Sequence, residues 1–462
     1  MERASRSVAD LLSPALLFVA AFALQSRSVG RVVIQAVDEG VYLYAARLIA
    51  DGLVPYRDFF LSHPPLLIAG AAAGFRLTGF DVPLFSLLYI AWVFSSLFPL
   101  YALLRRLSAS RAAAVFGGVL LCVSPIIAGF DGRYFALRPA SVPLLAWGLA
   151  ALFGGFPALG GLLLGAFSGS VATNVVLGVA LLAAWTAWGG PEGKGVSRGD
   201  AIRAWGAYAS FLLLTLAVIA VIPRGLENVF GFQLLRPRAD LGARLASLWT
   251  RVLPENAVLL VLGLGGCALA KGRARAIGFA AAAAFPVVIL GPGSYYPHYV
   301  SVFAFPFAVT AALAADRLLA TGRLRRATLG GLLVVALAAT SLPPFLATVF
   351  APPSIPFFRT VEVLGGSPEP LLAYEPIYAL YARRRLTSHY HVADVRFFRV
   401  ARLNLDEEVF SRLLSASGTV LVEPFFASLL TPARRRALDE RFEPVFFEPP
   451  HVVLVRRDGP RN

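Results

Sequence analysis

The chain has 462 residues, of which 57% are hydrophobic and only 15% are charged, and its mean hydropathy is +0.69. Soluble proteins rarely show this balance, so the composition predicts a membrane protein. The net charge of +15 comes almost wholly from arginine, because lysine stands only at Lys194 and Lys271. No nucleic-acid-binding module is recognisable, and we expect the basic charge to reflect topology and lipid headgroups. Cys122 and Cys267 lie in apolar segments, which argues against a disulfide framework and a cysteine metal site.

The apolar segments predict a polytopic, mainly α-helical bundle in residues 1–350. Because a span needs about 20 apolar residues, we predict about eleven transmembrane helices. The first, at 10–28, lacks a convincing cleavage site and is expected to be an uncleaved helix. The others are expected at 83–104, 111–128, 139–154, 157–172, 174–189, 202–223, 254–270, 275–291, 297–316 and 327–349.

A polar loop at about 30–82 separates the first two predicted spans. Asp38 and Glu39 precede an apolar pattern at i, i+3, i+4 and i+7, which predicts an amphipathic helix along the membrane surface with Asp38 as its N-cap. The shorter apolar segment 64–79 contains Arg76 and is predicted to be re-entrant or interfacial. Acids this close to a bilayer favour a functional site. From spacing alone, a loop with solvated charges is an equally good interpretation.

The basic residues predict the topology. With the N-terminus inside, short basic connections fall on the inner face, as the positive-inside rule requires. These connections are 105–111, 191–200, 271–276 and 316–327. The outer face then holds the first loop, 129–139, 223–252, 291–299 and everything after about 350.

The composition changes after residue 350. PPSIPFF is expected to be a linker, after which strand-like segments (370–376, 418–425 and 444–457) alternate with helix-like ones (377–386, 405–417 and 431–442). This alternation predicts a small α/β domain over 351–462, on the outer face.

Polar clusters in the outside segments are the candidate functional residues. Each alone has a plain structural explanation, such as an ion pair or an arginine that reaches the headgroups. The predicted topology, however, places all of them on one membrane face. The clusters are Asp38, Glu39, Tyr42, Arg57, Asp58 and His63; Asp131, Arg133, Tyr134 and Arg138; Gln233, Arg236, Arg238 and Asp240; and Tyr295, Tyr296, His298 and Tyr299.

Acids, arginines and aromatic residues without a nucleotide-binding motif suit sugar transfer from a lipid-linked phosphate donor. One carboxylate can take the proton of the acceptor hydroxyl, since the phosphate leaves with little acid assistance. Arginine, histidine and tyrosine donors would stabilise the charge on that phosphate. The candidates for this donor and substrate contact are Arg57, His63, Arg133, Arg138, Arg236, Arg238, Tyr295, Tyr296 and His298.

The pattern Asp38-Glu39-Gly40 with Tyr42, Gly52, Pro55-Tyr56, Asp58-Phe59 and His63-Pro64-Pro65 resembles the first extracytoplasmic loop of GT-C superfamily glycosyltransferases. The closest resemblance is to the protein mannosyltransferase and aminoarabinose transferase branch. The segment from Tyr295 to Tyr299, followed by Phe305-Pro306, also resembles a late helix entry of that group. The resemblance implies an inverting transferase in the cytoplasmic (inner) membrane that uses a polyprenyl-phosphate-linked sugar. It implies that Asp38 is the catalytic base, with Glu39 as its neighbour or substitute.

Metal and acceptor stay open. Some relatives bind a divalent cation with an acid of the second outside loop, which makes Asp38 and Asp131 the candidates for Mg or Mn. The loop lacks a D-x-D or E-x-E pair, so the sequence does not establish metal dependence. The acceptor could be a glycan, a lipid or a protein, although no MIR-type insertion supports a protein.

Two other functions compete with transfer. A transporter or lipid-linked glycan flippase should show internal repeats and ionisable residues in the middle of its spans. We find no convincing repeat, and the ionisable residues gather in the outside loops. An accessory scaffold without activity is the third interpretation.

Overall fold

The structure is a computed structural model. It describes residues 8–30, 37–124, 135–231, 240–290, 297–320, 330–387 and 407–457, apart from positions 331, 334, 338, 351 and 353. The chain divides into two compact units. The first consists of residues 1–29, 86–218 and 238–351, and the second of residues 30–85, 219–237 and 352–462.

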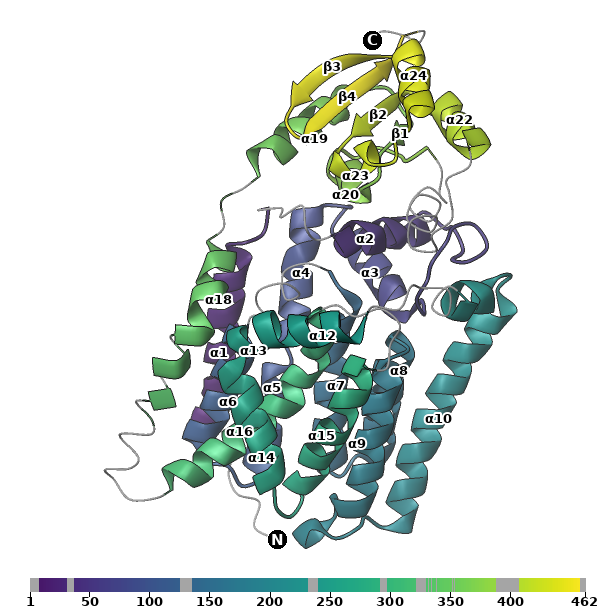
Figure 1. Cartoon of the computed structure of the whole chain (residues 1–462). Helices are drawn as coiled ribbons and strands as arrows, with labels where there is room; N and C mark the ends of the chain where they lie inside the picture. The colour runs from purple at the N-terminus through teal and green to yellow at the C-terminus, as the bar shows by residue number, and fades with distance from the viewer. Residues whose placement is uncertain are drawn as a thin grey trace. The chain divides into compact units, whose positions relative to one another are not determined.

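The first unit is helical (Figure 1). Neighbouring helices of the group α6, α16, α15, α9, α8 and α7 pack side by side in that order. Its α-helices are α1 (Val8–Ser26), α5 (Leu97–Arg106), α6 (Arg111–Val123), α7 (Leu137–Phe153), α8 (Pro157–Ser170), α9 (Asn174–Trp188), α12 (Leu241–Ser247), α13 (Leu253–Glu255), α14 (Ala257–Leu269), α15 (Ala274–Leu290), α16 (Ser301–Leu319) and α18 (Leu342–Val349). Helices α4 (Val82–Phe94) and α10 (Arg198–Val221) begin in one unit and end in the other.

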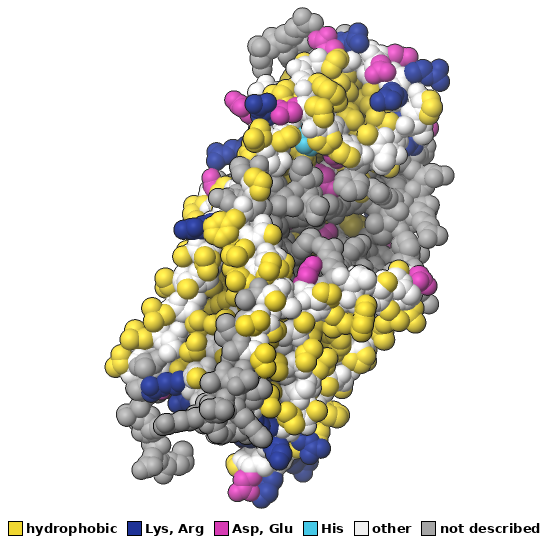
Figure 2. Space-filling view, turned by 60° about the vertical axis from the view of Figure 1, so that its left-hand side comes forward, with side chains coloured by type: hydrophobic (Ala, Val, Ile, Leu, Met, Phe, Trp, Pro, Cys, Tyr) yellow, Lys and Arg dark blue, Asp and Glu magenta, His cyan; other side chains and the backbone are white. Residues whose placement is uncertain are grey.

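A described helix overlaps each predicted span, which confirms a mainly helical architecture. Within the described residues, three helices are long and apolar enough to cross a membrane: Val82–Arg106, Arg198–Val221 and Ser301–Leu318. A fourth span is possible if Leu241–Glu255 and Ala257–Leu269, bent by 99°, count as one. Figure 2 shows hydrophobic side chains over the flank of the helical unit, with Lys and Arg gathered towards its lower end. The number of spans stays a prediction.

Glycines let α8 approach α10 closely. Gly161, Gly165 and Gly169 recur at four-residue spacing along α8 and so share one face. A Cβ at Gly161 would lie 2.0 Å from the carbonyl oxygen of Ala204, and one at Gly165 would lie 2.9 Å from that of Tyr208. Close backbone approach is a common source of stability between membrane helices.

We predict that Gly161→Ala destabilises the protein by about 1–3 kcal/mol, because the new methyl group forces the two backbones apart. The matched control is Gly206→Ala on α10, where an added Cβ meets nothing within 4 Å. Thermal unfolding of the detergent-solubilised protein measures both. Equal melting temperatures for the two variants would contradict this packing.

The second unit contains the first loop and a small mixed sheet. Its helices are α2 (Val37–Ala50), α3 (Leu66–Leu77), α19 (Ile355–Gly366), α20 (Pro376–Tyr381), α22 (Glu407–Ala416), α23 (Pro424–Ala427) and α24 (Pro432–Arg441). The strands are β1 (Leu371–Leu372), β2 (Thr419–Val422), β3 (Phe442–Glu448) and β4 (His451–Arg456), in the order β1-β2-β4-β3. β1 and β2 are parallel, and the other pairs are antiparallel. The predicted alternation of strands and helices is confirmed, whereas a domain boundary at 351 stays a prediction.

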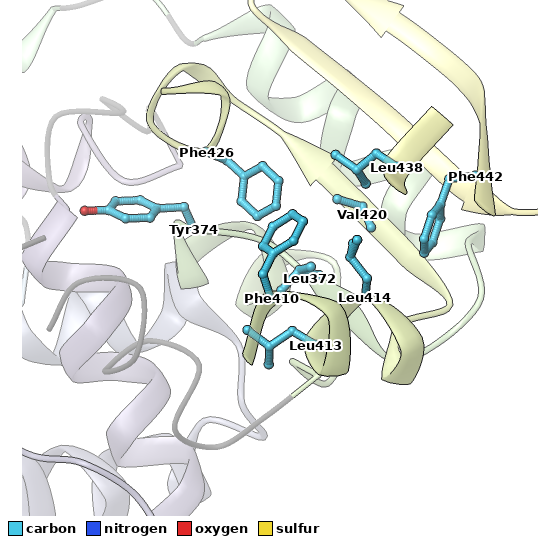
Figure 3. Close-up of a cluster of buried hydrophobic side chains, with 9 residues drawn as sticks. All are labelled: Leu372, Tyr374, Phe410, Leu413, Leu414, Val420, Phe426, Leu438 and Phe442. Atoms are coloured by element: carbon cyan, nitrogen blue, oxygen red, sulfur yellow. The ribbon is translucent and has the colours of Figure 1, made fainter. Parts of the chain in front are cut away.

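A hydrophobic core holds this sheet together. Its members come from β1, β2, α22, α23, α24 and the start of β3, and all are at most 6% exposed. They are Leu372, Tyr374, Phe410, Leu413, Leu414, Val420, Phe426, Leu438 and Phe442 (Figure 3). The Tyr374 hydroxyl points away from the other side chains of the cluster.

The prediction that PPSIPFF is a linker was wrong. Helix α19 begins inside it at Ile355, with a proline in its first turn, where the missing N–H has no helical partner to lose. Phe357, Thr360 and Leu364 are buried at helical spacing. The three prolines of the segment masked this pattern in the sequence.

Candidate functional site

The predicted loop helix is present as α2, but Asp38 is not its N-cap. The helix already includes Val37, so Asp38 and Glu39 both lie in its first turn. Carboxylates there still interact favourably with the unpaired N–H groups of a helix start. Asp38 is exposed, whereas Glu39 is only 5% exposed. The two acids therefore occupy different environments one residue apart.

Helix α2 is more enclosed than an amphipathic surface helix. Tyr44, Ala45 and Leu48, which the spacing placed on the apolar face, are buried. Leu43 and Ala46 are buried as well, because α3 and α20 both pack against α2. The predicted contact of this helix with a membrane surface stays a prediction.

Asp38 shares a face of α2 with Tyr42, since residues four apart on a helix are neighbours. The Tyr42 hydroxyl lies 3.1 Å from Nε2 of His63, and the two rings meet edge to face. The helix and the end of the loop therefore bring together an acid, a phenol and an imidazole predicted to belong to one site.

The segment that carries His63 is shaped by a buried tyrosine. Tyr56 has a left-handed backbone (φ 70°) and is fully buried. Its hydroxyl donates a hydrogen bond of 2.8 Å to the carbonyl of His63, and its N–H donates to the carbonyl of Phe59. Burial raises the pKa of Tyr56 well above its ordinary value, so the hydroxyl stays protonated and remains a donor.

Arg57 pairs with its neighbour in the loop. Nε and one terminal nitrogen of Arg57 donate to the two carboxylate oxygens of Asp58, each at 2.8 Å. Asp58 also accepts from the backbone N–H of Val54, which closes the turn. This pairing raises the pKa of the Arg57 guanidinium. Its role as a donor-phosphate ligand stays a prediction.

The start of α2 is seated closely against α20. A Cβ at Gly40 would lie 2.7 Å from the backbone nitrogen of Ile377, so only glycine permits this distance. One turn later, the Tyr44 hydroxyl accepts a buried hydrogen bond of 3.0 Å from the N–H of Leu386. The close packing of Gly40 against α20 was not predicted from the sequence. The signal was present, because glycine inside a helix often marks a close backbone approach.

In the first unit, Arg138 is a predicted site residue with several described contacts. It lies in the first turn of α7 and is 8% exposed. Its guanidinium carbon is 3.2 Å from the centre of the Tyr299 ring, and one terminal nitrogen donates to Oγ1 of Thr173 at 3.1 Å. The remaining Nε–H has no hydrogen-bond partner among the described residues.

Apart from Arg138, Tyr299 and Asp240, the predicted residues of the later clusters lie outside the described part of the chain. Asp240 is the exception in its cluster, because it caps α12 by accepting from the N–H of Ala243. No structure is described for Asp131, Arg133, Tyr134, Gln233, Arg236, Arg238, Tyr295, Tyr296 or the side chain of His298. Their assignment to the site stays a prediction.

No family model matches the chain, and no curated protein matches it significantly by sequence. Solved structures do match. ArnT from Cupriavidus metallidurans in the apo state has a TM-score of 0.69 at 16% identity, over 97% of this chain and 99% of that one. The same enzyme bound to undecaprenyl phosphate has a TM-score of 0.66 at 13% identity, over 98% and 100% of the two chains. The Archaeoglobus fulgidus oligosaccharyltransferase, in complex with zinc and sulfate, has a TM-score of 0.52 at 13% identity, over 95% and 73%.

The chain has the fold of ArnT. The fold implied by the first-loop pattern is thereby confirmed, at an identity too low to carry activity with it. The described residues contain no group of three or more His, Cys, Asp or Glu side chains that could hold a metal ion. Of the two predicted metal candidates, Asp38 is described and Asp131 is not, so the divalent cation stays a prediction.

We predict that Gly40→Ala lowers the stability of the protein by about 1–3 kcal/mol, because the methyl group collides with the α20 backbone rather than with a flexible side chain. Gly70→Ala on α3 is the matched control, since nothing lies within 4 Å of its added Cβ. Melting temperatures of the purified variants make the comparison. If the two variants have the same melting temperature, α2 does not pack against α20 as described.

Proposed function

We propose that the protein is a glycosyltransferase. It moves a sugar from a polyprenyl-phosphate-linked donor to an acceptor hydroxyl at the outer face of the cytoplasmic membrane, with inversion at the anomeric carbon. Asp38 is the catalytic base, and the acceptor is a glycan, a lipid or a protein.

The observation that carries the proposal is the likeness to ArnT along nearly the whole length of both chains, including a form of ArnT bound to undecaprenyl phosphate. The residues add independent support. The first loop presents an exposed acid on a helix seated against a second element, beside the paired Tyr42 and His63. A base has to be accessible to the acceptor, and the exposure of Asp38 meets this requirement.

The proposed reaction is one displacement. The Asp38 carboxylate takes the proton of the acceptor hydroxyl while that oxygen forms a bond to the anomeric carbon. The bond from this carbon to the phosphate oxygen breaks on the opposite side, and its electron pair leaves with the polyprenyl phosphate. Hydrogen-bond donors around the phosphate stabilise the added negative charge.

Arg138 is the described arginine best suited to donate to that phosphate. Tyr299 and Thr173 hold its guanidinium in place, and its buried Nε–H has no hydrogen-bond partner among the described residues. A guanidinium held in this way loses little conformational freedom when it binds a phosphate oxygen.

We predict that Asp38→Asn reduces transfer about 100- to 10,000-fold while leaving donor binding intact, because the amide cannot accept the proton. Asp51→Asn is the matched control, since Asp51 is an exposed acid at the other end of α2 and pairs with Arg47. The donor for the assay is the polyprenyl-linked sugar identified by mass spectrometry of lipid that co-purifies with the protein. Unchanged transfer in both Asp38→Asn and Glu39→Gln would exclude this base. Bound lipid-linked glycan that is moved across vesicles without transfer would favour a flippase.

We predict that Arg138→Gln weakens binding of undecaprenyl phosphate about tenfold or more, since a hydrogen bond to a charged group contributes about 1.5–3 kcal/mol. The control is Arg203→Gln, whose arginine is exposed and pairs with Asp200 on α10. Titration of the purified protein with undecaprenyl phosphate gives both dissociation constants. Equal weakening in the two variants would indicate a general charge effect instead of a site.

A further inference from the structure

Two parallel strands of the second unit end in the same way. Strand β1 leads through Ala373-Tyr374 to Glu375-Pro376, and β2 leads directly to Glu423-Pro424. Each Glu-Pro begins a helix, α20 in one case and α23 in the other. Leu372 is paired with Val420, and each glutamate stands three residues further along its chain. The register therefore places the two carboxylates next to each other at the carboxyl ends of the strands.

Both carboxylates are buried. Glu375 and Glu423 are each 1% exposed. No donor among the described residues lies in full hydrogen-bond geometry to either carboxylate oxygen of Glu423. A buried carboxylate without strong donors is costly in its charged form, and a second carboxylate beside it adds repulsion.

The side chains around this pair are also buried. On α20, the Tyr378 hydroxyl lies 2.7 Å from Nε2 of His451, the first residue of β4, and both residues are fully buried. Nδ1 of His451 has no hydrogen-bond partner among the described residues. Tyr374 and Tyr378 interact with the pair, and His451 in turn interacts with Glu448, which forms an ion pair with Arg359. From α2, the buried Glu39 stands next to Gly40, which contacts α20.

This cluster is directly connected to the candidate base. Glu375 precedes α20 without a gap, and the second residue of α20, Ile377, is the one that Gly40 of α2 contacts. The segment after α20 holds Leu386, whose N–H donates to Tyr44 of α2. A shift of Glu375 therefore moves the surface on which the first turn of α2 rests.

We propose that Glu375 and Glu423 form a carboxyl pair that positions α20, and through α20 the first turn of α2 with Asp38. The pair does not touch substrate and is not catalytic. The inference rests on the proposed function only for what Asp38 does.

The charge state follows from the surroundings. Burial raises the pKa of the Glu423 carboxyl well above its ordinary value, and Glu375 raises it further, against the opposing effect of nearby backbone amides. Burial and both glutamates raise the pKa of Tyr378, which stays protonated. Burial lowers the pKa of His451, against the charge of Glu448, so His451 is neutral at neutral pH. As pH rises above the ordinary carboxyl range, Glu423 is then the group in this cluster whose charge changes.

The sign of the pH dependence is set by the raised pKa. The stabilising contribution of protonated Glu423 is fully present below the ordinary carboxyl pKa and is lost as pH rises through the raised value. His451 acts in the other direction, because its contribution is lost only as pH falls through its lowered pKa. A loss of stability on raising the pH is therefore assigned to the glutamates and not to His451.

The test uses the full-length protein in detergent. We expect its melting temperature to fall as pH rises above the ordinary carboxyl range, and the fall to be lost in Glu423→Gln and reduced in Glu375→Gln, since the amide imitates the protonated acid. Glu440→Gln is the matched control, because Glu440 is exposed on α24, and it should follow the wild type. A fall of equal size in Glu423→Gln and the wild type would overturn the charge assignment.

The positioning role of the carboxyl pair is tested by a second measurement, which does not depend on sugar transfer. We expect amide hydrogen exchange in residues 37–50 at raised pH to be several-fold slower in Glu423→Gln than in the wild type, since the neutral amide removes a buried charge beside Glu375. Exchange in 301–319 should be the same in both. If Glu423→Gln does not fold, the wild-type exchange of 37–50, corrected for its intrinsic pH dependence, makes the same test. Exchange of 37–50 that does not respond to Glu423 or to pH would overturn the positioning role and leave the proposed transferase untouched.

Discussion

The contact between α2 and α20 is the constraint on which the candidate site depends. Gly40 brings two backbones to a distance that no side chain permits, and the Tyr44 hydroxyl accepts from Leu386 one turn later. A helix of 14 residues is marginal by itself, so α2 needs such partners to hold a carboxylate in one place. The C-terminal segment therefore supports the candidate base, since it belongs to the same compact unit as the first loop.

Arginine side chains in both units donate hydrogen bonds to carbonyls at the ends of helices. Helices end in carbonyls without helical partners, and these are costly where water is scarce. On the predicted inner face, Arg106 donates to Ala150, Arg273 donates to Phe153 and Gly189, and Arg317 donates to Leu269. In the second unit, Arg76 donates to Ala50 and Arg456 to the carbonyls at the end of α22. Many of the arginines from which the positive-inside rule predicts the topology thus also donate hydrogen bonds to carbonyls at helix ends.

The sequence predicted local features well and long-range contacts poorly. The apolar spacing after Glu39 indicated α2, and the strand-like segments indicated β1 to β4, because both signals lie within a few residues. Gly40 was not recognised, because its partner Ile377 is more than 300 residues away in the chain. The Glu375 and Glu423 segments were read as strands, yet their pairing appears only once the parallel register is known. Asp38 was predicted to be the N-cap of α2 but lies in its first turn, because helix ends are the least certain part of such patterns.

The structure also separates two acids that the sequence left as alternatives for the base. Consecutive residues on a helix project about 100° apart, so Asp38 and Glu39 cannot serve the same space. Glu39 is nearly enclosed, whereas Asp38 is exposed. Asp38 lies on the same face of α2 as Tyr42, whose hydroxyl contacts His63 of the loop. An acceptor hydroxyl arrives from solvent and must reach the base within hydrogen-bond distance. Access therefore favours Asp38 for proton removal. A buried Glu39 next to Gly40 is better placed to fix the first turn of α2 than to meet the acceptor.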